Sequence, residues 1–417
     1  MKIDSIKIKT LDTRFTSKPT RITEIKTRSG TIETPTRAAT MFEYNAKASV
    51  PTNILIGNPI TFKYSSVGHT LLKNLLSDNK PFSVMYNAQQ NANDRTQHSL
   101  LNFTLFQPTM TATEDDAGGK IPSAMEDLRN NHSELDKFLD LIIALQESLN
   151  FDIITIPYLD LPFSTLESEY KKRTKYIRSI GKEPFFVVHL KHNPQDFEKI
   201  MKLLTDELQV QLIGLNFQKF QYAALNYREL SKYYAKDVLF FTIQTTRIDS
   251  QFNEFSTPHY MPFLSNDIFS IASPPTFDPE KTNKKLEIDS IGGDKIKPKK
   301  LEVTYEEKLL KLRIFNKKEL NLQQIISPMK NYSDLLNDVE NPTDNRLINM
   351  LNNFMDKGFS KEEENERFSN LKSFTVIHEL KTSVSEFAKF REYIKQSDTT
   401  SYVSEHPLLN KALTTMK

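Results

Sequence analysis

The chain has 417 residues, of which 38% are hydrophobic and 10% aromatic, so it can bury a large core and still carry an appended domain. Its 55 Lys and Arg residues nearly balance its 53 Asp and Glu residues, so any surface that binds a polyanion must be local. Cysteine is absent, which excludes disulfides, thiol nucleophiles and thiolate zinc sites. No apolar run approaches ~20 residues and the first residues lack a signal-peptide core, so we expect a cytoplasmic protein without membrane contact.

Residues 1–60 are expected to form an arm followed by short β elements. This part is rich in Lys, Arg and Thr, and Pro35, Pro51 and Pro59 divide it into short pieces. We expect it to act as an antiparallel lid or cap that leads into the next domain.

Residues 61–275 show helical and strand patterns in alternation. Apolar residues recur at helical spacing from Leu135 to Leu145, and a β-branched run follows from Phe151 to Tyr158. Further along, the pattern predicts helices at 167–180, 195–208 and 225–234, and strands at 184–189, 211–215, 238–243 and 267–271. Strict alternation with short connections favours a parallel α/β fold. Because no Gly-x-Gly-x-x-Gly turn follows any strand, we expect a (β/α)8 TIM-like barrel rather than an open doubly wound sheet.

The rest of the chain divides at a segment rich in Pro, Gly and Lys. Residues 276–300 contain Gly292, Gly293 and a basic run that ends at Lys300, so we expect a linker or mobile loop. Residues 301–417 are strongly charged and mostly helical by pattern, which predicts a helical C-terminal domain.

Two carboxylates lie at the ends of the strand predicted between Phe151 and Tyr158: Asp152 at its start and Asp160 just after its end. Barrel enzymes place their chemistry at the carboxyl ends of strands, which favours Asp160 over Asp152 as a functional residue. Asp160 could equally cap the helix that follows, as could Ser164. The sequence leaves both roles open.

The stretch Ile143-Ala-Leu-Gln-Glu-Ser-Leu-Asn-Phe-Asp152 and the strand after it resemble the tRNA-guanine transglycosylase family, which exchanges a guanine in tRNA for a deazaguanine base. In that family an Ile-Gln-x-x-Leu-Gly-Ser-Asp-Ile-like run precedes a strand that carries a functional Asp. The opening Gly30-Thr-Ile-Glu-Thr-Pro and the tail Glu405-His-Pro-Leu-Leu are similar to the archaeal form. The resemblance implies a TIM barrel, with Asp160 in the place of the functional Asp.

The resemblance also implies base-binding positions on the next two strands. Where the family reads the base with Gln, this chain has His189, and the Gly-Gly-Leu element survives as Gly214 and Leu215. Glycine at a strand end allows a ligand to approach the backbone. A lone His at a strand end is nevertheless more often a satisfied polar side chain than a ligand.

The catalytic motifs of the family are altered. The nucleophile is the second Asp of an Asp-x-Phe-Asp motif, and Asp267-Ile-Phe-Ser270 keeps the first Asp but has Ser270 at the nucleophile position. A serine needs an activating base, and glycosyl intermediates normally form on carboxylates. The Asp-Ser-Gly-Gly-Phe-Gln motif, which brings the general acid/base, should fall near 83–90 and is not recognisable there.

The zinc site of the family is also incomplete. His378 matches the zinc-ligand His, but its three Cys partners are missing, so we expect neither a metal nor a cofactor.

Local basic clusters could contact phosphates without reading sequence. The main cluster comprises Lys171, Lys172, Arg173, Lys175 and Arg178; others lie at 295–300 and at Lys7, Lys9, Arg14, Lys18 and Arg21. Each cluster could also be an ordinary solvated surface.

Three functions remain open at this point. The first is a divergent transglycosylase that acts on tRNA or DNA, with Asp160 and Asp267 carrying the chemistry. The second is a catalytically silent relative that binds nucleic acid, as a homodimer or as the partner of an active transglycosylase subunit. The third is a barrel enzyme for an unrelated small molecule.

Overall fold

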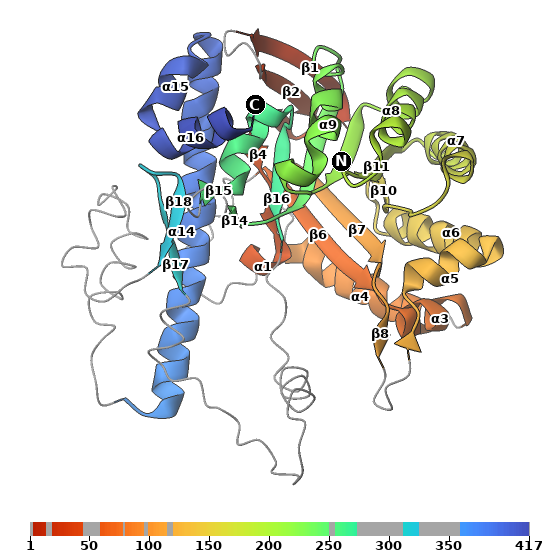
Figure 1. Cartoon of the computed structure of the whole chain (residues 1–417). Coiled ribbons are helices and arrows are strands. Elements are labelled where there is room, and N and C mark those ends of the chain that lie inside the picture. The colour runs from red at the N-terminus through yellow and green to blue at the C-terminus, as the bar shows by residue number, and fades with distance from the viewer. Residues whose placement is uncertain are drawn as a thin grey trace, which may run out of the picture.

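The computed structural model describes residues 3–13, 19–44, 59–77, 80–95, 99–114, 120–249, 255–272, 312–324 and 359–416. In Figure 1, strands at the centre are surrounded by helices, and the long helix α14 (Lys361–Lys395) runs along one side. The linker expected at 276–300 lies outside the described residues.

Two parallel sheets form the centre of the molecule (Figure 1). The first has the order β10 (Ile153–Ile156), β11 (Glu183–His189), β12 (Leu212–Asn216), β13 (Leu239–Thr245), β16 (Ile268–Ile271) and β4 (Thr36–Arg37). The second has the order β5 (Ala39–Thr40), β6 (Ile60–Val67) and β7 (Leu101–Pro108). Only Ala38 separates β4 from β5, and β7 contacts β10, so the two sheets adjoin at both ends.

Helices alternate with these strands, and the predicted α/β class is confirmed. They are α3 (His69–Ser77), α4 (Lys80–Arg95), α5 (Ala124–Asn130), α6 (His132–Ser148), α7 (Phe163–Ser179), α8 (Pro194–Lys202) and α9 (Phe220–Ser231). Local signals fix their ends: the Asn131 side chain caps α6, and Asn193 caps α8, which starts with Pro194. The helix predicted to reach residue 208 ends at Lys202 and continues as a short π-helix, Leu203–Glu207.

The two faces of the parallel strands pack differently. Phe186 and Phe240 belong to the core beneath the helices, whereas Phe103, Phe185 and Phe241 belong to a second, inner core. The ring of Phe103 on β7 lies 5.2 Å from that of Phe185 on β11 and 5.1 Å from that of Phe241 on β13, between centroids. These strands are not neighbours, so the sheets curve around the inner core.

A separate antiparallel sheet precedes the parallel strands, as expected for a cap. It consists of β1 (Ile3–Asp12), β2 (Thr20–Thr27) and β3 (Gly30–Glu33), and its Ile6, Ile25 and Ile32 join the inner core. The expected domain boundary at residue 60 needs correction, because β4 and β5 lie before it and already belong to the parallel sheets.

The C-terminal part contributes strands as well as the predicted helices. β17 (Arg313–Asn316) and β18 (Asn321–Gln324) form an antiparallel sheet with β14 (Ile248–Asp249) and β15 (Phe255–Ser256), and α15 (Thr399–Glu405) and α16 (Pro407–Thr415) follow α14. Buried ion pairs fasten α14 to the parallel strands, because Glu379 lies 3.6 Å from Arg37 and also pairs with Arg247. Within the described residues, no helix combines the length and hydropathy that crossing a bilayer requires.

Candidate functional site

The carboxyl ends of the parallel strands meet at one edge of the inner core, which is the edge where α/β proteins place their sites. We call this edge the mouth. Its inward-facing side chains are Tyr64, Gln107, Tyr158, His189, Asn216, Thr245 and Ser270. Their positions follow from strand alternation, since Leu105, Val187, Ile243 and Ile268 belong to the inner core.

His189 is the last residue of β11 and pairs with Asn216 across to β12. Its Nδ1 accepts a hydrogen bond of 3.0 Å from the backbone N–H of Lys191. Because a backbone N–H can only donate, the neutral ring carries its proton on Nε2. Burial, with Lys191 nearby, lowers the pKa of His189 to about 4. The ring is therefore neutral near pH 7 and presents an N–H donor beside the Asn216 amide.

Tyr158 is fixed by a side-chain clamp from β7. Gln107 accepts a hydrogen bond of 3.1 Å from the Tyr158 backbone N–H and donates one of 2.9 Å to its carbonyl. The phenol ring meets His189 edge to face at 4.9 Å and His192 at 5.5 Å between centroids. Burial raises the pKa of Tyr158 to about 12, so its hydroxyl stays protonated. The mouth thus has a rigid aromatic wall next to hydrogen-bonding groups.

Asp160 lies at the outer side of this wall and does not cap a helix. It accepts a 3.2 Å hydrogen bond from the Tyr158 hydroxyl, and its carboxylate pairs with Arg129 of α5. Helix α7 instead begins after Pro162 without a side-chain cap. Asp160 and Arg129 are 44% and 47% exposed, so solvent reaches a carboxylate that a cation already neutralises. Asp152, by contrast, lies before the first residue of β10, 3.5 Å from the Lys182 amine.

Ser270 faces the interior of the mouth but has no activating base. Its hydroxyl and that of Thr245 are buried, and neither has a hydrogen-bond partner among the described residues. The ladder is interrupted between Thr242 and Thr245, where Gln244 adopts a positive φ of 58°. A positive φ costs a residue other than glycine about 1–2 kcal/mol. At Gln244 the positive φ accompanies the interruption of the ladder just before Thr245, the last residue of β13.

Asp267 needs correction as a catalytic candidate, because it precedes β16 and lies at the opposite end of the strand from the mouth. Its oxygens accept hydrogen bonds of 2.9 and 2.6 Å from Arg21 and one of 2.9 Å from the Phe240 backbone N–H. The carboxylate is 1% exposed, and the Arg21 side chain is fully buried. Asp267 therefore joins β2 to β13 and β16 and cannot reach a ligand at the mouth.

Gly214 and Leu215 also lie below the mouth rather than in it. Gly214 pairs with Val187, two residues before the end of β11, and a Cβ there would lie 2.8 Å from the Phe185 ring. The glycine is required by the packing of the inner core. Leu215 points the other way, into the core beneath the helices. The base contact expected from the backbone of Gly214 and Leu215 stays a prediction, and the structure shows that both positions also serve the packing of the two cores.

The segment expected to match the acid/base motif, 83–90, lies within helix α4. The strand that reaches the mouth after this helix is β7, and its mouth residue is Gln107. Gln107, Asn216 and Tyr64 were not predicted from the sequence to lie at the mouth. Alternation of Leu101, Phe103 and Leu105 with polar residues was a signal that could have placed Gln107 at a strand end.

The basic cluster on α7 is largely occupied by ion pairs. Arg173 is 2% exposed and pairs with Asp136 and Asp140 of α6. Lys172 also pairs with Asp136, Lys171 with Glu167 and Glu207, and Arg178 with Glu183. Lys175 is exposed on the same helix. In the amino-terminal cluster, Arg21 is buried and Lys9 pairs with Glu24, while Arg14 and Lys18, like 295–300, lie outside the described residues. Of the α7 cluster, Arg173 is therefore a buried structural contact, whereas a phosphate contact by the exposed Lys171, Lys172, Lys175 and Arg178 stays a prediction.

His378, which the resemblance matches to a zinc ligand, has a hydrogen-bond partner within the protein. Its Nε2 lies 3.1 Å from the carbonyl oxygen of Phe315 on β17. Among the described residues there is no group of three or more His, Asp or Glu side chains arranged to hold a metal ion.

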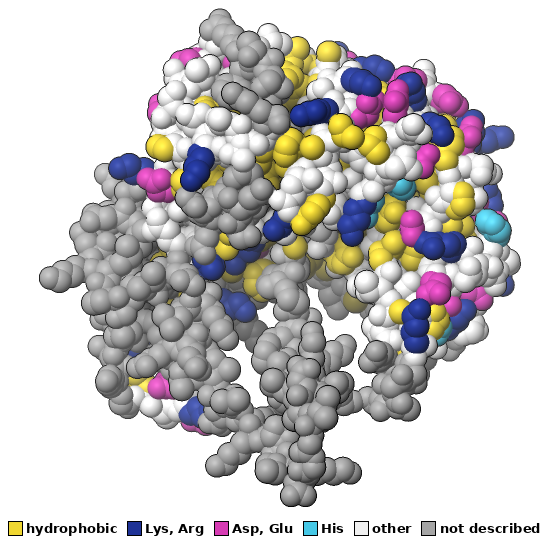
Figure 2. Space-filling view, viewed as in Figure 1, with side chains coloured by type: hydrophobic (Ala, Val, Ile, Leu, Met, Phe, Trp, Pro, Cys, Tyr) yellow, Lys and Arg dark blue, Asp and Glu magenta, His cyan; other side chains and the backbone are white. Residues whose placement is uncertain are grey.

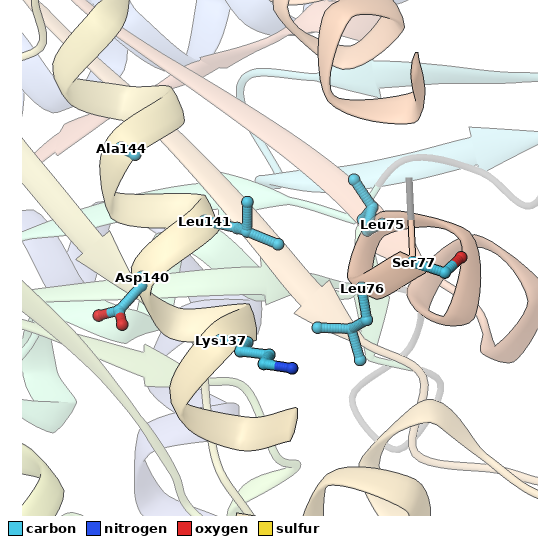
Figure 3. A pocket seen from close by; sticks show the side chains of 7 residues that line it. All are labelled: Leu75, Leu76, Ser77, Lys137, Asp140, Leu141 and Ala144. Atoms are coloured by element: carbon cyan, nitrogen blue, oxygen red, sulfur yellow. The ribbon is translucent and has the colours of Figure 1, made fainter. Parts of the chain in front are cut away.

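A hollow of about 530 Å³ lies away from the mouth, between α3 and α6 (Figure 3). Its lining includes Leu75, Leu76, Leu141, Lys137 and Asp140. The Asp140 carboxylate already pairs with Arg173, and the remaining lining is mostly aliphatic. The mouth is therefore the better candidate for recognition of a polar ligand.

No family model matches the chain, and comparison with curated proteins gives no significant match. The assignment of function consequently depends on the geometry of the mouth.

Proposed function

We propose that the parallel strands close a (β/α)8 barrel of the transglycosylase type. Counting β4 and β5 as one, the two sheets supply eight parallel positions within the described residues: β4/β5, β6, β7, β10, β11, β12, β13 and β16. The junction at Ala38, the contact of β7 with β10 and the Phe103–Phe241 contact across the inner core support closure. Side chains filling the interior are typical of such a barrel.

The mouth, in this proposal, binds a guanine-like base of tRNA or, less favourably, of DNA. The observation that carries the proposal is the neutral His189 beside Asn216 and the clamped Tyr158 ring. An uncharged purine needs N–H and amide partners for its edge and an aromatic surface for its face, and these three side chains supply both. A base in tRNA as ligand would place the protein in the cytoplasm.

The protein binds this base without exchanging it, as a silent relative that acts alone or beside an active transglycosylase subunit. Ser270 occupies the nucleophile position implied by the resemblance, and no described base lies within hydrogen-bond distance of its hydroxyl. A serine in that state does not form a glycosyl intermediate. Asp160, the carboxylate nearest to Tyr158, is neutralised by Arg129.

Calorimetric binding of free guanine and 7-deazaguanine tests the proposal. His189→Ala should weaken binding by about tenfold, because the lost bond is worth about 1–1.5 kcal/mol, whereas His189→Gln should keep a donor and most of the affinity. His132→Ala, on the surface at the start of α6, is the matched control and should change nothing. If guanine does not bind, or if His189→Ala binds as the wild type does, base recognition at the mouth is wrong.

A divergent exchange enzyme is the second candidate, and the half-exposed Asp160 beside Tyr158 is the observation that favours it. Labelled guanine supplied with tRNA distinguishes the two. Incorporation that disappears in Asp160→Asn would establish exchange through Asp160. No incorporation together with guanine binding supports the silent relative. Absence of both would favour an unrelated small-molecule ligand.

A further inference from the structure

Partly or largely exposed aromatic, apolar and basic side chains lie on β6 and on the segments that follow the carboxyl ends of β7, β11 and β12. We call five of these side chains the rim: Tyr64 on β6, Met110 after β7, Lys191 after β11, and Lys219 and Tyr222 after β12. Tyr222 is 70% exposed, Tyr64 40% and Met110 39%. In Figure 2, hydrophobic side chains with Lys and Arg among them cover the region where Figure 1 draws α9, the helix that begins beside Lys219.

The most exposed of these rings is held on an anchored turn. Tyr227 donates a hydrogen bond of 2.9 Å from its hydroxyl to the Gln218 carbonyl, and its ring stacks on Phe220 at 5.9 Å between centroids. Ala223, with φ −138° and ψ 20°, interrupts α9 directly after Tyr222. The first turn is therefore fixed to the body of the helix while Tyr222 points into solvent. A ring presented on a fixed backbone loses little conformational entropy when it binds.

The two lysines of the rim are not paired with carboxylates of the described residues. Lys191 and Lys219 form no ion pair within the described residues, in contrast to the basic residues of α7. The acidic groups beside the rim have their own partners, since Asp160 pairs with Arg129 and Asp196 with Lys199. The rim therefore combines exposed rings with positive charge.

We propose that the rim binds an unpaired strand of nucleic acid, with bases stacked on Tyr222 and Tyr64 and phosphates beside Lys191 and Lys219. Aromatic rings interleaved with cations are the combination that recognises single strands, because a ring can stack only on a base that is free of its duplex neighbours. The inference rests on the proposed function, since the base that enters the mouth must leave a helix and the nucleotides beside it then lie on the rim.

Fluorescence anisotropy tests the rim with labelled single-stranded RNA and DNA of roughly 16 nucleotides and with the corresponding duplexes. The single strands should bind at least about tenfold more tightly than the duplexes, and Tyr222→Ala should weaken binding by about fivefold or more, as expected for one lost stack. Lys191→Ala and Lys219→Ala should each reduce the slope of log affinity against log salt by about 0.7. Tyr176→Ala and Lys171→Ala are matched controls on α7 and should leave both quantities unchanged.

Three results would overturn the proposal: equal binding of single strands and duplexes, an effect of Tyr222→Ala no larger than that of Tyr176→Ala, or rim variants that change only the self-association of the protein in sedimentation. Titration of the wild type and Tyr222→Ala with free guanine separates the two proposals. Guanine binding without strand binding refutes the rim and leaves base recognition intact. Strand binding that depends on the rim without guanine binding refutes base recognition at the mouth and leaves the rim.

Discussion

Replacing Asp267 with Asn should destabilise the fold and leave the mouth unaffected. Asp267 and Arg21 are almost completely buried and are joined by hydrogen bonds of 2.9 and 2.6 Å. The neutral amide would leave the Arg21 charge in the interior without a counter-ion. Breaking a buried pair in this way costs about 3–5 kcal/mol, which is a large part of the 5–15 kcal/mol by which proteins are typically stable. Arg21→Met should cost more, because Arg21 also saturates the carbonyls of Tyr234, Lys236 and Val238.

Urea unfolding followed by circular dichroism measures this loss, with Asp206→Asn as the matched control. Asp206 pairs with Lys236 at 2.6 Å, but both side chains are about half exposed, so the control should lose less than about 1 kcal/mol. Guanine affinity of folded Asp267→Asn should equal that of the wild type. An unfolding free energy as little changed as that of Asp206→Asn, together with lost guanine affinity, would refute a structural role for Asp267 and return it to the site.

Three further predictions concern titration, metal and charge. Because burial lowers the pKa of His189 from the 6.5 of an unfolded chain to about 4, its contribution to stability is complete above about pH 6.5 and is lost as the pH falls through about 4. Guanine affinity should likewise stay constant down to about pH 5, and an NMR titration of the ring with a midpoint near 6.5 would contradict this. Elemental analysis should find no stoichiometric zinc and chelator should leave the melting temperature unchanged, since His378 already contacts the Phe315 carbonyl; one zinc per chain would refute this. Arg173→Ala should lower the melting temperature but leave the salt slope of nucleic-acid binding unchanged, because Arg173 pairs with Asp136 and Asp140; a flatter slope without destabilisation would argue for a phosphate contact.

The repeating units of the fold were predictable from sequence because they depend on local patterns. The strands predicted at 184–189 and 211–215 lie within one residue of β11 and β12, since continuous apolar runs between helices specify buried parallel strands. Strands β4 and β5 were missed because each spans two residues and is defined by pairing with β16 and β6, which no local pattern records.

The site was predictable only in part, because side-chain roles depend on contacts between distant segments. His189 and Ser270 were placed on strands that reach the mouth, whereas Asp267 was grouped with Ser270 although it precedes the strand. The direction of the chain alone could have separated them, since Asp267 precedes β16 and Ser270 lies near its carboxyl end. The burial of Arg173 could not be foreseen, because its partners lie 33 and 37 residues away on α6.

A crystal structure with bound guanine would show whether the mouth recognises the base. We expect the base at the mouth, with its ring against Tyr158, its edge within hydrogen-bond distance of His189 Nε2 and no covalent bond to Ser270 or Asp160. Guanine bound elsewhere, such as in the hollow between α3 and α6, or no guanine at the mouth at saturating concentration, would refute base recognition at the mouth.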